Sequence, residues 1–167
     1  MKTFLNIMAV MMLMAFAPAA TELPSLTHDN ATEEYCNKRF NYCLQYPSDY
    51  FLKMEKSDNG DGITLKTPDE AIDLQVTGSY NVMDWSIKDI YYHTFDQDIR
   101  GDLNTQVVTS LFDDTFSEVT LKSGNRLEFF QTYLLDNAYV TINISVPANT
   151  PELLEQLRKS VNLSVSV

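Results

Sequence analysis

Two cysteines have the most constrained chemistry in this chain. Cys36 and Cys43 are its only cysteines, and six residues separate them. The features of the N-terminus predict export from the cytoplasm. Outside the cytoplasm, an even number of cysteines is typical of disulfide bonding. Closing a loop of about eight residues stabilises a fold by roughly 2.5 kcal/mol in the chain-entropy model. The C-x6-C spacing is not the C-x-x-C spacing of thiol redox enzymes, so we predict a structural Cys36–Cys43 disulfide.

Residues 58–62, Asp-Asn-Gly-Asp-Gly, have the composition of a calcium loop but not its spacing. An EF-hand loop needs oxygen ligands at positions 1, 3 and 5 and a glutamate at position 12. Counted from Asp58, positions 3 and 5 are glycines and position 12 is Asp69. Asn-Gly and Asp-Gly pairs favour tight hairpin turns. The segment therefore predicts a turn without a metal ion.

Histidines and clustered carboxylates form no complete catalytic set. His28 falls in a polar N-terminal segment and His93 on the exposed face of a predicted helix, whereas a triad or a zinc site needs a histidine held beside its partners. Asp113, Asp114 and Glu118 lie around a predicted turn, not across a sugar-sized cleft. We predict no catalytic residue, no bound cofactor and no resident metal.

Aromatic residues around that helix are the best candidates for partner binding. Trp85 stands at the expected start of the helix, and Tyr92 is offset from the apolar stripe that contains Tyr91. Such rings anchor protein partners or flat ligands. We predict Trp85 and Tyr92 as partner-binding residues; the alternative is that both rings cover the edge of the sheet.

Alternating apolar residues predict that strands position these groups. The first strand runs from Phe40 to Tyr46 and ends at Pro47. Seven further strands are expected at 50–56, 63–67, 72–76, 106–112, 116–122, 126–135 and 139–146. Helical spacing predicts a helix from Ile87 to about Gly101, with Asp84 or Ser86 as its N-cap, and a second helix that starts at Pro151.

The order of these elements predicts the fold class. Residues 40–76 read as three successive hairpins, and the strands between the two helices read as a second meander. Strands grouped in runs, with a helix after each run, are typical of an α+β fold rather than of βαβ units. We predict a curved antiparallel β-sheet of two meanders, covered by two main helices.

Across residues 36–163 the chain resembles the PsbP/DcrB-like superfamily. The matching features are the aromatic strand that ends in Tyr46-Pro47, the hairpin at 58–63, the strand after Thr67-Pro68-Asp69, the turn at 136–139 and the closing helix after Pro147. The resemblance implies a curved antiparallel sheet between helices, and with the signal peptide described below this chain would be an exported bacterial member. Proteins of this superfamily are largely non-enzymatic and share no catalytic set, so the resemblance carries no site residue to this chain.

The N-terminus has the features of a secretory signal peptide. Lys2 precedes an apolar run from Ile7 to Ala17, and Ala17 and Ala19 stand at the −3 and −1 spacing that a signal peptidase reads. The run is shorter than the roughly 20 residues that span a bilayer. We predict a signal peptide at 1–20, an N-terminal arm at 21–35 and one α+β domain at 36–167, located in the periplasm or secreted; an uncleaved anchor is the alternative.

The charge of the chain restricts its partners. Lys and Arg number 12 against 23 Asp and Glu, which gives a formal net charge of −11. Such a surface repels nucleic acid and anionic lipid. A basic protein, a divalent cation or a small neutral ligand remains compatible with it, and the oligomeric state is not indicated.

Together these patterns predict an exported, non-catalytic binding or accessory domain of the bacterial envelope. Two alternatives stay open: an acid/base hydrolase that uses Asp and Glu carboxylates, and an immunity or inhibitor-type protein that binds a basic partner. A concave pocket with two converging carboxylates would favour the hydrolase.

Overall fold

The computed structural model describes residues 31–101 and 104–165, so the predicted signal peptide lies outside the described residues. Two helices are α1 (Ile87–Gly101) and α2 (Pro151–Ser160). The strands are β1 (Thr32–Asn37), β2 (Tyr42–Pro47), β3 (Lys53–Lys56), β4 (Gly62–Lys66), β5 (Asp73–Tyr80), β6 (Thr105–Phe112), β7 (Phe116–Ser123), β8 (Arg126–Leu134), β9 (Ala138–Pro147) and β10 (Asn162–Val165). None of the described helices is long and apolar enough to span a membrane.

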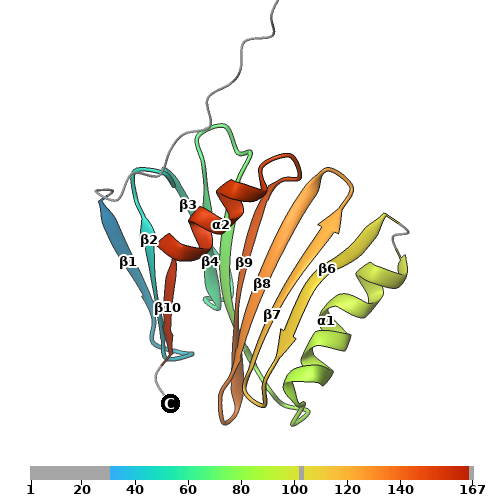
Figure 1. The fold of residues 1–167 in the computed structure, drawn as a ribbon. Helices are drawn as coiled ribbons and strands as arrows, with labels where there is room; N and C mark the ends of the chain where they lie inside the picture. The colour runs from blue at the N-terminus through green and yellow to red at the C-terminus, as the bar shows by residue number, and fades with distance from the viewer. Residues whose placement is uncertain (1–30, 102–103, 166–167) are drawn as a thin grey trace, which may run out of the picture.

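The strands form two antiparallel sheets. The large sheet has seven strands in the order β3-β4-β5-β9-β8-β7-β6, and the small sheet has three in the order β1-β2-β10 (Figure 1). Helix α1 connects β5 in the interior of the large sheet to β6 at its edge, and β9 returns between β5 and β8. The predicted α+β class with two main helices is confirmed.

Two details of the predicted topology are wrong. A single sheet was expected, but β2 pairs with β1 and β10 and not with β3, so the first predicted hairpin does not form. Pro47 ends β2, and the N–H groups of Tyr50 and Phe51 donate to the Pro47 carbonyl at 3.2 and 3.3 Å. This tight turn carries the chain from the small sheet into the large one, and it shortens the predicted strand at 50–56 to β3.

The predicted boundary of the N-terminal arm at residue 35 is also wrong, because β1 already begins at Thr32. Its residues Glu33 and Glu34 are exposed, so the strand lacks the apolar alternation that would reveal it. The short strand β10, which pairs with β2 after α2, was missed for a similar reason: four residues carry too little pattern.

The main core lies between the two sheets and beneath α2. Leu44 from β2, Leu74 from β5 and Val140 from β9 are fully buried in it. Helix α2 contributes Leu153, Leu154 and Leu157, as its apolar stripe predicts. Each such side chain stabilises the fold by roughly 1.5–3 kcal/mol relative to exposure.

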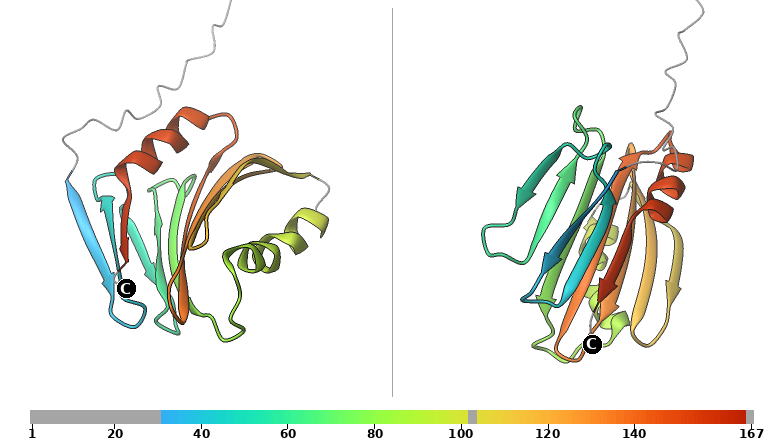
Figure 2. Two further views of the ribbon diagram at one scale, coloured as in Figure 1. Left: turned by 60° about the horizontal axis from the view of Figure 1, so that its bottom comes forward. Right: turned by 90° about the vertical axis from the view of Figure 1, so that its left-hand side faces the viewer.

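Helix α1 covers the opposite face of the large sheet (Figure 2, left). Phe95 is buried there against Val119 and Leu121 of β7. Its ring meets Phe130 of β8 edge-on, with ring centroids 4.4 Å apart. This second, smaller core fixes α1 across the edge half of the sheet.

Candidate functional site

Five connecting segments lie in the lower half of Figure 1, with the β3–β4 turn higher than the others, and we call this region the hairpin end. It comprises the turns at 38–41, 57–61, 113–115 and 135–137 and the β5–α1 loop at 81–86. Hydrogen bonds link neighbouring segments: Asn37 Nδ2 donates to the Gly60 carbonyl at 3.0 Å, and the Asn81 N–H donates to the Asn137 carbonyl at 2.8 Å. Loops held by a rigid sheet are the usual places for binding residues.

The β5–α1 loop is held in one conformation by its own side chains. The Asn81 side chain bonds Trp85 twice: its Oδ1 accepts from the Trp85 N–H and its Nδ2 donates to the Trp85 carbonyl, both at 2.9 Å. Ser86 and Asp89 then cap α1 reciprocally, since the Asp89 carboxylate accepts from the Ser86 N–H and the Ser86 Oγ accepts from the Asp89 N–H. Of the two predicted N-cap residues, Ser86 therefore caps the helix.

This loop exposes two apolar side chains. Val82 is 85% exposed and Met83 is 64% exposed. Because the hydrogen bonds of Asn81 hold the loop, a partner that contacts these side chains would order little additional chain on binding. Sequence reasoning missed both residues, because two apolar residues in a loop have no periodicity to distinguish them.

Of the two predicted partner-binding residues, Trp85 lies in this loop and Tyr92 lies in α1. Trp85 is half-buried, and its ring stacks on His93 with centroids 4.0 Å apart and an interplanar angle of 7°. Tyr92 is exposed and contacts Tyr91 edge-on. Tyr92 is thus open to a partner while Trp85 is in part covered by His93; their role in binding stays a prediction.

A small cleft opens next to the loop, between the β1–β2 and β8–β9 turns. Its volume is about 120 Å³, and its lining includes Arg39, Phe40, Tyr80, Asp136 and Asn137. The Arg39 guanidinium lies 5.0 Å from the Phe40 ring centroid and 5.2 Å from that of Tyr80. The cleft thus combines aromatic faces, a cation and polar groups, and it has room for one side chain.

Carboxylates are frequent in the same five segments. Six aspartates stand in the five segments of the hairpin end, against two basic residues, Lys38 and Arg39. The aspartates are Asp58, Asp61, Asp84, Asp113, Asp114 and Asp136. Hydrogen bonding from the side chains of Ser57 and Asn59 holds the pKa of Asp61 below its usual value, so this carboxylate is negative at neutral pH. The hairpin end is therefore acidic, and it also exposes the apolar side chains of Val82 and Met83.

The candidate calcium loop at 58–62 is the β3–β4 turn. Gly60 has φ of 70°, and the Ser57 Oγ accepts from the Gly62 N–H at 2.9 Å. Asn59 Nδ2 donates to Asp61 at 2.8 Å, so the polar side chains of the turn bond one another. These contacts confirm the predicted turn.

A second cavity, of about 190 Å³, lies under α2 and holds two carboxylates. The Arg158 guanidinium bridges them: Nη2 lies 3.0 Å from Glu118 and Nη1 lies 2.9 Å from Glu155. The same guanidinium stacks over Phe129, 4.1 Å from the ring centroid. The carboxylates of the cavity thus converge on a cation of the protein, the Arg158 guanidinium, which both of them contact.

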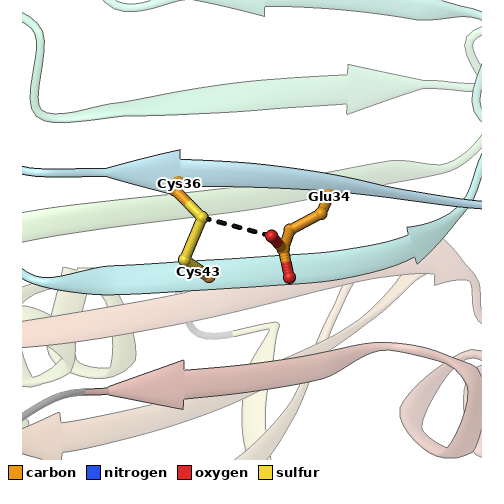
Figure 3. Close-up of side chains that lie close together, drawn as sticks. All are labelled: Glu34, Cys36 and Cys43. Carbon is orange, nitrogen blue, oxygen red and sulfur yellow. Dashed lines mark hydrogen bonds between the residues drawn. A yellow bond between two sulfur atoms is a disulfide. The ribbon is translucent and has the colours of Figure 1, made fainter.

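Cys36 and Cys43 form the predicted disulfide, directly opposite each other on β1 and β2. A Glu34 carboxylate oxygen lies 3.5 Å from the Cys36 sulfur (Figure 3). These three side chains bring their ligand atoms within 4.8 Å of one another. Metal binding by cysteine requires thiolates, and both sulfurs are consumed by the disulfide.

Comparison with known proteins identifies the fold. The solution structure of cyanobacterial PsbP (CyanoP) from Synechocystis sp. PCC 6803 matches with a TM-score of 0.57 and 14% identity, over 85% of this chain and 99% of that one. The chain has a PsbP-like fold. A crystal structure from Bacteroides thetaiotaomicron VPI-5482 matches with a TM-score of 0.46 and 12% identity, over 81% of this chain and 48% of that one. No family model and no curated protein matches the sequence.

The PsbP-like fold confirms the resemblance seen in the strand order and the turns. At 14% identity the match describes the arrangement of the backbone, and function has to be argued from side chains. In this chain, the hairpin end is one place where exposed side chains from several segments gather away from the cores.

Proposed function

We propose that this chain is an exported, non-catalytic binding domain of the bacterial envelope, and that its hairpin end docks a basic protein. The observation that carries the proposal is the pair Val82 and Met83, exposed on a loop that hydrogen bonds hold in place. Apolar anchors inside a polar rim are the usual anatomy of a protein interface.

The chemistry of the rim supports a basic partner. The six aspartates of the hairpin end attract lysine and arginine side chains, and complementary charge speeds association and selects among partners. The cleft beside Tyr80 supplies a pocket for a single side chain of that partner. An immunity or inhibitor-type role would be one form of this binding.

The arrangement in the second cavity disfavours the hydrolase alternative. A glycosidase needs one protonated and one ionised carboxyl on either side of the substrate. In the cavity under α2, Glu118 and Glu155 instead share the Arg158 guanidinium. These carboxylates therefore support a structural ion-pair network rather than acid–base catalysis.

Export is supported by the N-terminal pattern and by the disulfide, because disulfides persist in oxidising compartments. N-terminal sequencing of the protein from a periplasmic fraction tests it. A chain that starts at residue 20 or 21 supports cleavage of the signal peptide. An intact Met1 would show that the N-terminus is retained.

The docking is tested with a photo-crosslinking amino acid at position 83 in cells. The matched control is the same amino acid at position 52, because Leu52 is 66% exposed, close to the 64% of Met83, but lies outside the hairpin end. We expect a basic envelope protein to be crosslinked from position 83 and not from position 52. Equal crosslinking from both positions would contradict the proposal.

A second measurement uses the crosslinked protein as the ligand. A variant with Val82→Ser and Met83→Ser should bind it at least tenfold more weakly than wild type, whereas Leu52→Ser should not change binding. Raised salt should weaken the wild-type complex, since charges at an exposed rim are screened. An affinity that changes neither with the loop variant nor with salt would exclude this interface.

A further inference from the structure

The two edge strands of the large sheet differ in length and in chemistry. One edge is β3, four residues long, of which Lys53, Glu55 and Lys56 are charged. The other edge is β6, eight residues long with the sequence Thr-Gln-Val-Val-Thr-Ser-Leu-Phe and no charged residue. Soluble proteins commonly protect a solitary edge with charges and short length. The β3 edge has this protection and the β6 edge lacks it.

The side chains of β6 are unusually exposed for a strand. Residues 106–111 are all exposed, and Leu111 is 57% exposed. Val107 and Val108 are exposed as well. A bulge at Val108 interrupts the pairing with β7, but Thr109–Phe112 continue in regular register. Within the described residues β6 pairs with β7 alone, so the outer edge of residues 106–111 has no neighbouring strand.

We propose that β6 is an association edge, through which two copies of this chain pair as antiparallel strands about a two-fold axis. The backbone groups of an edge are satisfied by another extended strand. A second copy supplies such a strand without charge, although each chain carries a net charge of −11 and copies repel each other elsewhere. The two large sheets would become one continuous sheet.

The charges beside β6 favour the antiparallel arrangement. The acidic turn Asp113-Asp114 follows the C-terminal end of the strand, whereas Lys122 of β7 pairs with Gln106 near its N-terminal end. Antiparallel pairing places the acidic turn of each copy at the Lys122 end of the other. Parallel pairing would place the two acidic turns together, where they repel.

Packing of the second core leaves one face of this edge open. Phe112 points to the α1 side of the sheet, where its ring lies 5.0 Å from that of Tyr91. Because successive residues of a strand point to opposite faces, Leu111 points to the face without α1. In the two-fold pair, both Leu111 side chains lie on that face and are covered in part by the neighbouring strand.

The test is the oligomeric state of the purified protein by sedimentation velocity across a range of micromolar concentrations. Wild type should form dimers as concentration rises. Leu111→Lys should raise the dimer dissociation constant by more than about tenfold, because an edge lysine opposes strand addition. Met54→Lys on β3 is the matched control, since Met54 is also an exposed apolar residue of an edge strand, and it should leave the dimer unchanged.

Two results would overturn the proposal: wild type that stays monomeric throughout, or a dimer that Leu111→Lys does not weaken while circular dichroism shows that the variant is folded. The outcome is independent of docking at the hairpin end. A Leu111→Lys monomer should still crosslink its partner from position 83.

Discussion

Gly78 shows how a residue without a side chain positions a functional ring. A Cβ at position 78 would lie 2.3 Å from Cγ of Phe40, so the ring can rest on β5 only because this residue is glycine. Phe40 in turn lies 5.0 Å from the Tyr80 ring, and both rings face the Arg39 guanidinium. The aromatic side of the cleft therefore depends on a residue that does not line it.

Gly78→Ala should lower the free energy of unfolding by about 1–3 kcal/mol, the usual cost of adding a methyl group to a packed core. Chemical denaturation followed by circular dichroism measures this change. Ser79→Ala, at the next position of the same strand, should change stability by less than about 0.5 kcal/mol.

The stated cause can be tested separately. If the loss comes from contact with the ring, Gly78→Ala should cost less in a Phe40→Ala background, which removes Cγ and Cδ2, the two atoms nearest to the added Cβ. An equal loss in both backgrounds would show that the strand backbone, and not the Phe40 ring, resists the change.

At the residue scale, sequence reasoning succeeded where chemistry is local. The cysteine pair and the turn at 58–62 were predicted because both follow from residue type and short spacing. Val82 and Met83 were not, because their importance depends on what the surrounding loop does. Only the two hydrogen bonds between Asn81 and Trp85 show that the loop presents these side chains instead of burying them.

Among the elements, the small sheet depends on the pairing of β1 with β2. The disulfide joins opposite positions of these strands, and the Tyr46 hydroxyl of β2 donates to Glu33 of β1 at 3.1 Å. Because β1 contributes few buried side chains, the disulfide is an important part of what holds β1 against β2. The N-terminal strand is thus more sensitive to redox conditions than the large sheet.

Replacing both cysteines, Cys36→Ser with Cys43→Ser, should lower the free energy of unfolding by about 2.5 kcal/mol, because the unfolded chain gains the entropy of an open loop. Urea denaturation measures the change. A reductant should lower the stability of wild type to that of the variant and should not affect the variant. Two free thiols in the unreduced, denatured protein would contradict the disulfide.

Strands and helices with many buried residues were predicted well, and the polar or short strands of the small sheet, β1 and β10, were not. Both helices and the strands β4, β5, β7, β8 and β9 carry apolar periodicity because one face of each packs on a core. Strands β1 and β10 are polar or short, and their existence depends on β2 lying between them. The separation of β2 from β3 likewise depends on the turn after Pro47, which alternation alone does not reveal.

For the whole molecule, buried tyrosines set the alkaline limit of stability. Burial raises the pKa of Tyr46, which also bonds Glu33, to about 12, and burial raises that of Tyr50 to about 12 as well. The pKa of Tyr42 is raised above both, again chiefly by burial. In the unfolded chain these groups titrate near 10, so the folded state holds its phenolic protons more tightly.

Below pH 10 these tyrosines are protonated in both states, so their contribution to the free energy of unfolding is at its maximum. The free energy of unfolding should fall as pH rises from 10 towards 12, because the unfolded chain loses these protons first. Denaturation at a series of pH values measures the fall, and the ultraviolet absorbance of tyrosinate reports the titration. Tyr46→Phe should show a smaller fall than wild type. If the free energy of unfolding falls equally with pH in the two proteins, the alkaline loss of stability comes from other groups.

The sequence by itself determined the α+β class, the two main helices, the disulfide pair, the acidic charge and the resemblance to PsbP-like proteins, because periodicity, spacing and composition are local properties. Tertiary structure decided which strands pair, and with that the division into two sheets, the exposed β6 edge and the gathering of five segments at the hairpin end. Those features depend on contacts between residues far apart in the chain. Their physical cause is the burial of two cores on opposite faces of one sheet, which no single segment encodes.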